Sequence, residues 1–158
     1  LKEVVDAVTR TVGANRTGIR LSPFITERGM KDDEIIETIL LAAKELENIS
    51  LLYIHLSEAD WDDAPTIPEK FRHDLRNVYK GNIIVAGKYT KQRAEDILNK
   101  DLADLVAFGR PFIANPDLPR RYMENLPLSV FDAPTLFGGT EKGYSDYPSC
   151  GKAEELKK

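Results

Sequence analysis

Two apolar segments end in a glycine next to residues that could bind a phosphate. The segment "NIIVAG" ends at Ala86-Gly87, and residues 105–108 lead into Gly109-Arg110. Glycine lets the backbone approach a ligand closely, while Arg110 stands beside Pro111 and a predicted helix N-terminus, where amide donors are free. The pattern predicts a phosphate site at the ends of the two segments. The alternative is that both glycines only allow sharp turns.

Arg20 and His55 lie inside two other apolar segments. An arginine aimed into a core needs an anion or an electron-rich ligand atom, because an unpaired buried charge is costly. Alternatively, Arg20 points outward against a helix and pairs with a carboxylate. His55 could be catalytic, but its apolar neighbours favour a hydrogen-bonded structural histidine.

Metal chemistry has few candidate ligands. Cys150 is the only cysteine and there are two histidines, so we expect no metal site and no internal disulfide. The acidic run at Glu58, Asp60, Asp62 and Asp63 matches no ligand spacing, and we expect a solvated loop there. Trp61 in the same loop either lines a pocket or anchors the loop.

Strand and helix patterns alternate along the chain. An opening helix is followed by four predicted strands, each with a helix after it; the strands cover residues 16–24, 51–57, 82–87 and 102–109. Residues 105–108 read as a strand buried on both faces. Repeated βα units predict a parallel sheet of the α/β class, either a small doubly wound sheet or half of a (β/α)₈ barrel. In both, ligands bind at the carboxyl ends of the strands.

Length, charge and apolar content limit the domain organisation and the classes of partner. The 158 residues predict one domain over 1–158, with a C-terminal loop and tail over 127–158. A helical pattern that begins at Leu1 without a cap before it predicts that this domain is partial. The net charge is −4. We expect Phe131, Phe137, Tyr144 and Tyr147 to be packed in that tail. The lack of a basic stripe argues against nucleic acid. The absence of a membrane-length apolar run or leader makes a cytoplasmic protein the expectation.

Several motifs together resemble the C-terminal half of the old yellow enzyme family. In chain order they are "LKEVVDAV", "GIRLSPF", "YIHLSEADW", "IIVAGKYT", "VAFGRPFIANPDLPRR" and "LFGGTEKGYSDYP". Within the family the sequence is most similar to the branch that includes N-ethylmaleimide reductase. The resemblance implies half of a (β/α)₈ barrel that binds FMN. It also implies hydride transfer from NAD(P)H through FMN to the β-carbon of an activated alkene, including xenobiotics.

The resemblance also implies roles for single residues. Arg20 matches the arginine at the flavin, and the phosphate loops are matched by Ala86, Gly87, Phe108, Gly109 and Arg110. Trp61 matches the rim of the substrate pocket. Phe137 stands where relatives often have a tyrosine in that substrate pocket, and Val85 and Lys88 replace smaller residues beside the phosphate.

The family's substrate-gripping and proton-donating groups belong to the N-terminal half, so the resemblance implies no catalytic residue in this chain. We expect the isolated chain to be inactive, and to self-associate or pair with a missing N-terminal half-barrel. The alternatives are an inactive half-barrel that binds FMN or another phosphate ligand, or an assembly subunit. An aldolase-type barrel is disfavoured because the predicted strands contain no lysine.

Overall fold

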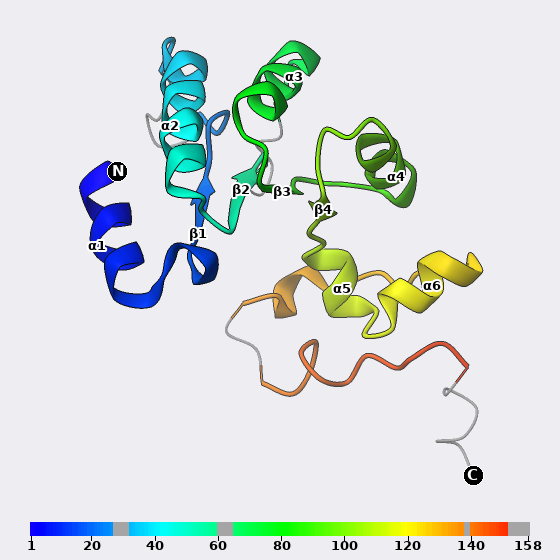
Figure 1. Cartoon of the computed structure of the whole chain (residues 1–158). Coiled ribbons are helices and arrows are strands. Elements are labelled where there is room, and N and C mark those ends of the chain that lie inside the picture. The colour runs from blue at the N-terminus through cyan, green and yellow to red at the C-terminus, as the bar shows by residue number, and fades with distance from the viewer. Residues whose placement is uncertain (27–31, 60–64, 138–139, 152–158) are drawn as a thin grey trace. The chain divides into compact units, whose positions relative to one another are not determined.

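The computed structural model describes residues 1–26, 32–59, 65–137 and 140–151. It divides into two compact units, residues 1–107 and 108–158 (Figure 1). Among the described residues, no helix is long and apolar enough to cross a membrane. The expectation of a single partial domain over 1–158 stays a prediction.

The first unit is built on a parallel four-stranded sheet whose strands pair in chain order. The strands are β1 (Gly18–Leu21), β2 (Tyr53–Ser57), β3 (Asn82–Ala86) and β4 (Leu105–Val106). A doubly wound sheet reverses its strand order at a switch point, whereas a barrel adds each strand beside the previous one. The observed order therefore favours the barrel over the open sheet, a choice that the sequence left open.

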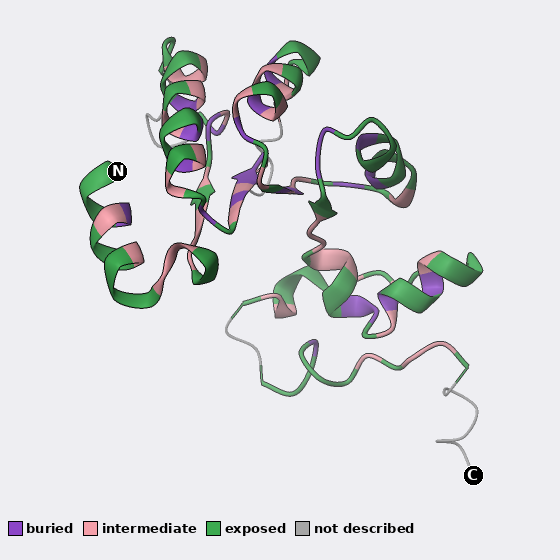
Figure 2. Ribbon diagram, in the orientation of Figure 1, coloured by how far each residue is buried: buried purple, intermediate pink, exposed green. Residues whose placement is uncertain are grey.

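Helices cover one face of this sheet. They are α2 (Ile35–Ile49), α3 (Glu69–Val78) and α4 (Lys91–Asn99), preceded by α1 (Lys2–Val12) and the 3₁₀ turn η1 (Ala14–Arg16). Strand residues such as Ile54, Leu56, Ile83 and Val85 are nearly inaccessible to solvent. Figure 2 shows buried segments on these helices and on the strands. Thr90 caps α4, because its hydroxyl accepts the Arg93 N–H.

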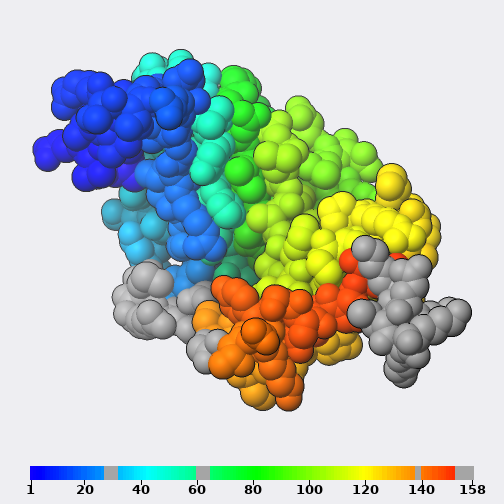
Figure 3. All heavy atoms as spheres, turned by 90° about the horizontal axis from the view of Figure 1, so that it is seen from below, coloured from blue at the N-terminus to red at the C-terminus, as the bar shows by residue number. Residues whose placement is uncertain are grey.

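The opposite face of the sheet is less buried and more polar. The register places Arg20 beside His55, His55 beside Ile84, and Ile84 beside Leu105. Seen from below, segments of the first unit lie side by side in chain order, from blue to green (Figure 3). Leu105 is 55% exposed and β4 has two residues, so the prediction of a strand buried on both faces over 105–108 was wrong. The helices cover only one face of the sheet, so the other face of β4 is not buried by them.

The second unit contains α5 (Arg110–Ala114), α6 (Leu118–Glu124) and the 3₁₀ turn η3 (Ala133–Thr135). Its buried residues are Ala114, Asn115, Leu118 and Arg121, with Gly143 in the tail. The expectation that the tail aromatics are packed is only partly confirmed. Tyr147 is half-buried, but Phe137 and Tyr144 are 69% and 76% exposed. Hydrogen bonds hold the tail instead of an aromatic core.

Candidate functional site

The carboxyl ends of β2 and β3 are joined backbone to backbone. Ser57 is in register with Ala86, and the Glu58 N–H donates to the Ala86 carbonyl at 2.7 Å. Gly87 follows directly. A Cβ built on Gly87 would lie 2.8 Å from the Glu58 Cβ and 3.1 Å from the Ala59 nitrogen. The chain comes close to its neighbour at this point and leaves no room for a side chain on Gly87.

Lys88 has a left-handed backbone, with φ of 49°. Lysine adopts this conformation at a cost, so the surrounding contacts must hold it. The Arg93 side chain donates to the Lys88 carbonyl at 3.1 Å from the first turns of α4. A left-handed residue following a close turn can direct successive N–H groups into one concavity, which is a common anion site.

Glu58 lies beneath this loop with its carboxylate buried. The residue is 3% exposed, and Arg72 of α3 donates to both carboxylate oxygens. The Tyr89 hydroxyl donates to Glu58 Oε2 at 2.8 Å. Burial, followed by the Glu58 charge, raises the pKa of Tyr89. Burial alone would lower the pKa of Arg72, but the hydrogen bonds and charge of Glu58 outweigh it and raise that pKa.

The solvated-loop prediction was wrong for Glu58. Its three acidic companions lie outside the described residues. The sequence analysis missed Arg72. This residue is a charged neighbour of the buried Phe71, but its ion pair with Glu58, 14 positions away, has no signature in the sequence.

Arg20 projects from the sheet face opposite the helices. Its register partner is His55, while its neighbours Ile19 and Leu21 pair with buried residues of β2. The Arg20 guanidinium donates to the Ser57 hydroxyl at 2.8 Å. The alternative of an arginine turned toward a helix is therefore wrong.

His55 lies next to Arg20 on the same face. Its Nε2 is buried without a hydrogen-bond partner among the described residues. Burial, then the charge of Arg20, lowers the pKa of His55. The hydrogen-bonded structural histidine expected here is not observed at Nε2. A buried polar atom without a hydrogen-bond partner among the described residues thus lies on the face that Arg20 shares.

Gly109 and Arg110 open the second unit. A Cβ on Gly109 would meet nothing within 4 Å, so this glycine faces open space. The Arg110 guanidinium lies 5.9 Å from the Phe131 ring centroid, and Phe108 packs edge-on against Tyr122. The predicted helix does begin at Arg110, with Pro111 in its first turn. It has only five residues, so its dipole adds little to the arginine's charge.

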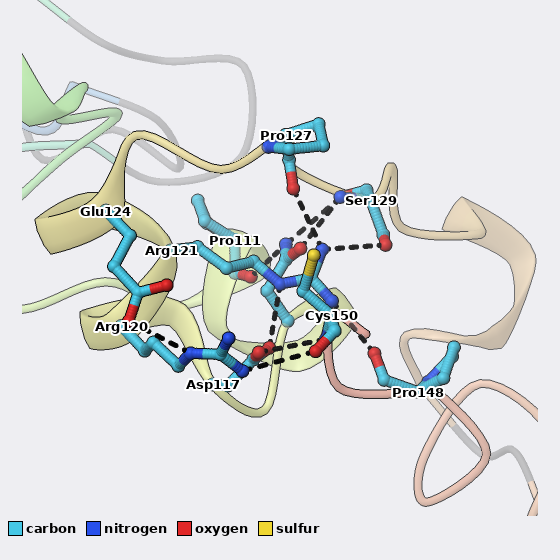
Figure 4. Close-up of polar contacts among 10 residues, drawn as sticks. Pro111, Asp117, Arg120, Arg121, Glu124, Pro127, Ser129, Pro148 and Cys150 are labelled. Carbon is cyan, nitrogen blue, oxygen red and sulfur yellow. Dashed lines mark hydrogen bonds and ion pairs between the residues drawn. The ribbon is translucent and has the colours of Figure 1, made fainter. Parts of the chain in front are cut away.

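A polar network fixes the end of α5 and the tail of the second unit (Figure 4). The Asn115 side chain donates to the carbonyls of Pro111 and Ser129 and accepts the Ser129 N–H. The buried Arg121 donates to Asp117 Oδ1 at 2.7 Å and to the Pro148 carbonyl at 2.9 Å. The motif around residues 114–121 thus has a structural purpose inside this unit.

The remaining predicted residues divide between the units. Arg20, Ala86 and Gly87 belong to the first unit, and Phe108, Gly109 and Arg110 belong to the second. Trp61 lies outside the described residues. Phe137 is exposed, and its role in a substrate pocket stays a prediction.

Repeated βα units whose parallel strands pair in chain order are the arrangement found in a (β/α)₈ barrel. A model of the NADH:flavin oxidoreductase / NADH oxidase family matches residues 1–129. The chain belongs to this family, whose members use flavin and nicotinamide cofactors.

Curated relatives from plants are reductases. The chain is 36% identical over 148 residues to a 12-oxophytodienoate reductase-like protein of Solanum lycopersicum, covering 92% of the chain and 39% of that protein. It is 37% identical over 151 residues to 12-oxophytodienoate reductase 2 of Arabidopsis thaliana, covering 93% and 40%. The chain thus spans about two fifths of the length of these relatives.

Solved structures of similar fold include a morphinone reductase and an old yellow enzyme. Morphinone reductase in complex with tetrahydroNAD matches with a TM-score of 0.87 and 45% identity, over 94% of this chain and 39% of that one. The old yellow enzyme of Trypanosoma cruzi matches with a TM-score of 0.85 and 32% identity, over 94% and 39%. The fold is therefore that of the C-terminal half of a (β/α)₈ barrel of the old yellow enzyme type.

Proposed function

We propose that this chain supplies the FMN-phosphate part of an ene reductase. The observation that carries the proposal is the close backbone approach at Gly87 next to the left-handed Lys88. When bound, FMN would supply hydride transfer between NAD(P)H and the β-carbon of an activated alkene. The likeness to morphinone reductase and 12-oxophytodienoate reductases supports this class of substrate, with some xenobiotics among them.

The described residues fit a phosphorylated flavin in three respects. The Gly87-Lys88 backbone runs where no side chain fits on Gly87, as in loops that let the backbone approach a ligand closely. Gly109 faces open space next to the cationic Arg110, so its backbone is accessible to a ligand. Each loop offers hydrogen-bond donors suited to an anion. Ala86 and Phe108 complete the proposed set of cofactor-binding residues.

Arg20 would act on the ring system rather than on the phosphate. Its guanidinium is held by the Ser57 hydroxyl on the polar face of the sheet, where the unpartnered Nε2 of His55 also lies. A fixed positive charge there would stabilise negative charge on an electron-rich ring. The lowered pKa keeps His55 neutral near pH 7, so a second cation does not compete with Arg20.

We further propose that the chain works only with an N-terminal half-barrel and is inactive alone. Its matches cover 38% to 41% of the lengths of the curated relatives compared. The substrate-gripping and proton-donating groups would come from the other half, and self-association is the alternative outcome for the isolated chain. A cytoplasmic location is part of the same proposal.

A flavin titration tests the phosphate assignment. FMN and riboflavin differ by the phosphate, so the chain should bind FMN more tightly, as followed by flavin fluorescence. Arg110→Ala should weaken FMN binding about tenfold and leave riboflavin binding unchanged. Arg120→Ala, which removes an exposed arginine of the same unit paired with Glu124, is the matched control. Equal affinity for both flavins in the unsubstituted chain would contradict the phosphate assignment.

FMN binding without turnover after an N-terminal half is added would favour the second reading, an inactive flavin-binding half-barrel.

A further inference from the structure

The buried Glu58 contacts residues on both sides of Lys88 in the loop between β3 and α4. Its N–H donates to the Ala86 carbonyl, and its Cβ occupies the space where a Gly87 side chain would lie. Its carboxylate accepts the Tyr89 hydroxyl. One residue thus braces the loop before and after the left-handed position.

Arg72 completes the cluster from α3. The guanidinium donates to Glu58 Oε1 and Oε2, the latter at 2.9 Å, with side chains that are 11% and 4% exposed. Each oxygen of the buried carboxylate therefore has at least one donor. Tyr89 is in turn covered by the Arg93 guanidinium, 4.8 Å from its ring centroid.

This arrangement is a poor choice for stability alone. Burying an ion pair costs desolvation, and apolar residues of similar size often do as well. A bare carboxylate beneath an anion site would also repel a phosphate, an effect that Arg72 offsets. Directional hydrogen bonds do offer geometric precision, which a phosphate cradle requires.

We propose that Glu58, fixed by Arg72 and Tyr89, is a positioning residue that sets the backbone of Gly87 and Lys88 for the phosphate. The inference rests on the proposed function, because it assumes that this loop binds the FMN phosphate. None of the three side chains contacts the ligand; they act through the loop.

The test compares two tyrosines that each lose one buried hydroxyl hydrogen bond. Tyr89→Phe removes the donor to Glu58 and keeps the ring beneath Arg93. Tyr79→Phe removes the hydroxyl that donates to the Leu51 carbonyl at 2.8 Å, near the amino-terminal end of the sheet, from a residue that is fully buried. Glu58→Gln serves as a second variant that keeps the side-chain shape.

Two readouts are measured on the full chain. The first is the ratio of FMN affinity to riboflavin affinity, which a general loss of stability does not change. The second is hydrogen exchange at the Lys88 and Tyr89 amides without ligand. Tyr89→Phe and Glu58→Gln should lower the ratio about tenfold and accelerate exchange, while Tyr79→Phe leaves both unchanged.

Other outcomes overturn the inference in distinguishable ways. If the unsubstituted chain prefers FMN and both loop variants keep that preference, the positioning role fails while the proposed function stands. If Tyr79→Phe changes both readouts as much as Tyr89→Phe does, the Glu58 cluster contributes only general stability and the positioning role fails. If the unsubstituted chain does not prefer FMN, the proposed function fails, and the positioning role fails with it.

Discussion

Gly87 and Gly109 both follow strands, but their surroundings differ. A Cβ on Gly87 would approach the Glu58 Cβ at 2.8 Å and backbone atoms at 3.1 Å, whereas one on Gly109 would meet nothing within 4 Å. Gly87→Ala should therefore lower the free energy of unfolding by about 1–3 kcal/mol, because the backbone must shift. Gly109→Ala should change it by less than about 0.5 kcal/mol. Urea denaturation of the two variants measures both values, and equal losses would contradict the close packing at Gly87.

His55 makes stability depend on pH. Its pKa is lowered in the folded chain, by burial first and then by Arg20. The unfolded chain binds a proton near pH 6.5 and the folded chain binds it at lower pH, so stability falls as pH drops below about 6.5. Replacing His55 with Asn should flatten the stability profile between pH 7 and 5. His73→Asn, at an exposed histidine, is the control. An unchanged profile in the His55 variant would show that His55 does not cause the dependence.

At the scale of elements, the network around Arg121 ties the tail to α6. The Asp117 carboxylate accepts from Arg121 and from the Cys150 N–H. Arg121→Met should remove these ties and accelerate hydrogen exchange at the Cys150 amide about tenfold, the equivalent of one lost hydrogen bond. Met123→Ala, at a 76% exposed position of the same helix, should leave that exchange unchanged. Protection that survives in the Arg121 variant would contradict the anchoring role.

The same network predicts an acid-sensitive tail. Burial would raise the pKa of Asp117, but hydrogen bonds from Arg121 and the Cys150 amide outweigh it and hold the pKa below the ordinary 3.8. The contribution of this carboxylate is present above about pH 4 and is lost as pH falls through the lowered pKa. Exchange at the Cys150 amide, corrected for its intrinsic pH dependence, should therefore rise at low pH in the native chain. In Asp117→Asn it should already be fast at pH 7.

Element order was predictable from the sequence, and the buried contacts were not. Apolar patterns located four strands and their helices, because the spacing of apolar residues and the residues that begin and end a helix are local signals. The choice between open sheet and barrel required strand order, which depends on pairings far apart in the chain. Glycines at strand ends marked the loops. The ion pair of Glu58 with Arg72, the face taken by Arg20 and the exposure of Phe137 depended on packing that sequence spacing does not encode.

At the scale of the whole molecule, this chain spans about two fifths of the length of its relatives. One face of its sheet carries partly exposed apolar residues. Leu105 is 55% exposed, next to the half-buried Ile84. Such a surface favours association. The isolated chain should sediment as more than a monomer and should shift to a one-to-one complex when an N-terminal half-barrel is added. A monodisperse monomer that ignores the added half would contradict this expectation.

The most direct measurement uses a chimera in which this chain replaces the equivalent part of morphinone reductase, which it matches over 39% of that structure. The chimera should bind FMN and consume NADH in the presence of N-ethylmaleimide, while this chain alone should show no turnover. The Arg110→Ala chimera should require about tenfold more FMN for the same rate. A folded chimera that binds no FMN, or whose FMN requirement ignores Arg110, would contradict the assignment of this half as the phosphate-binding half.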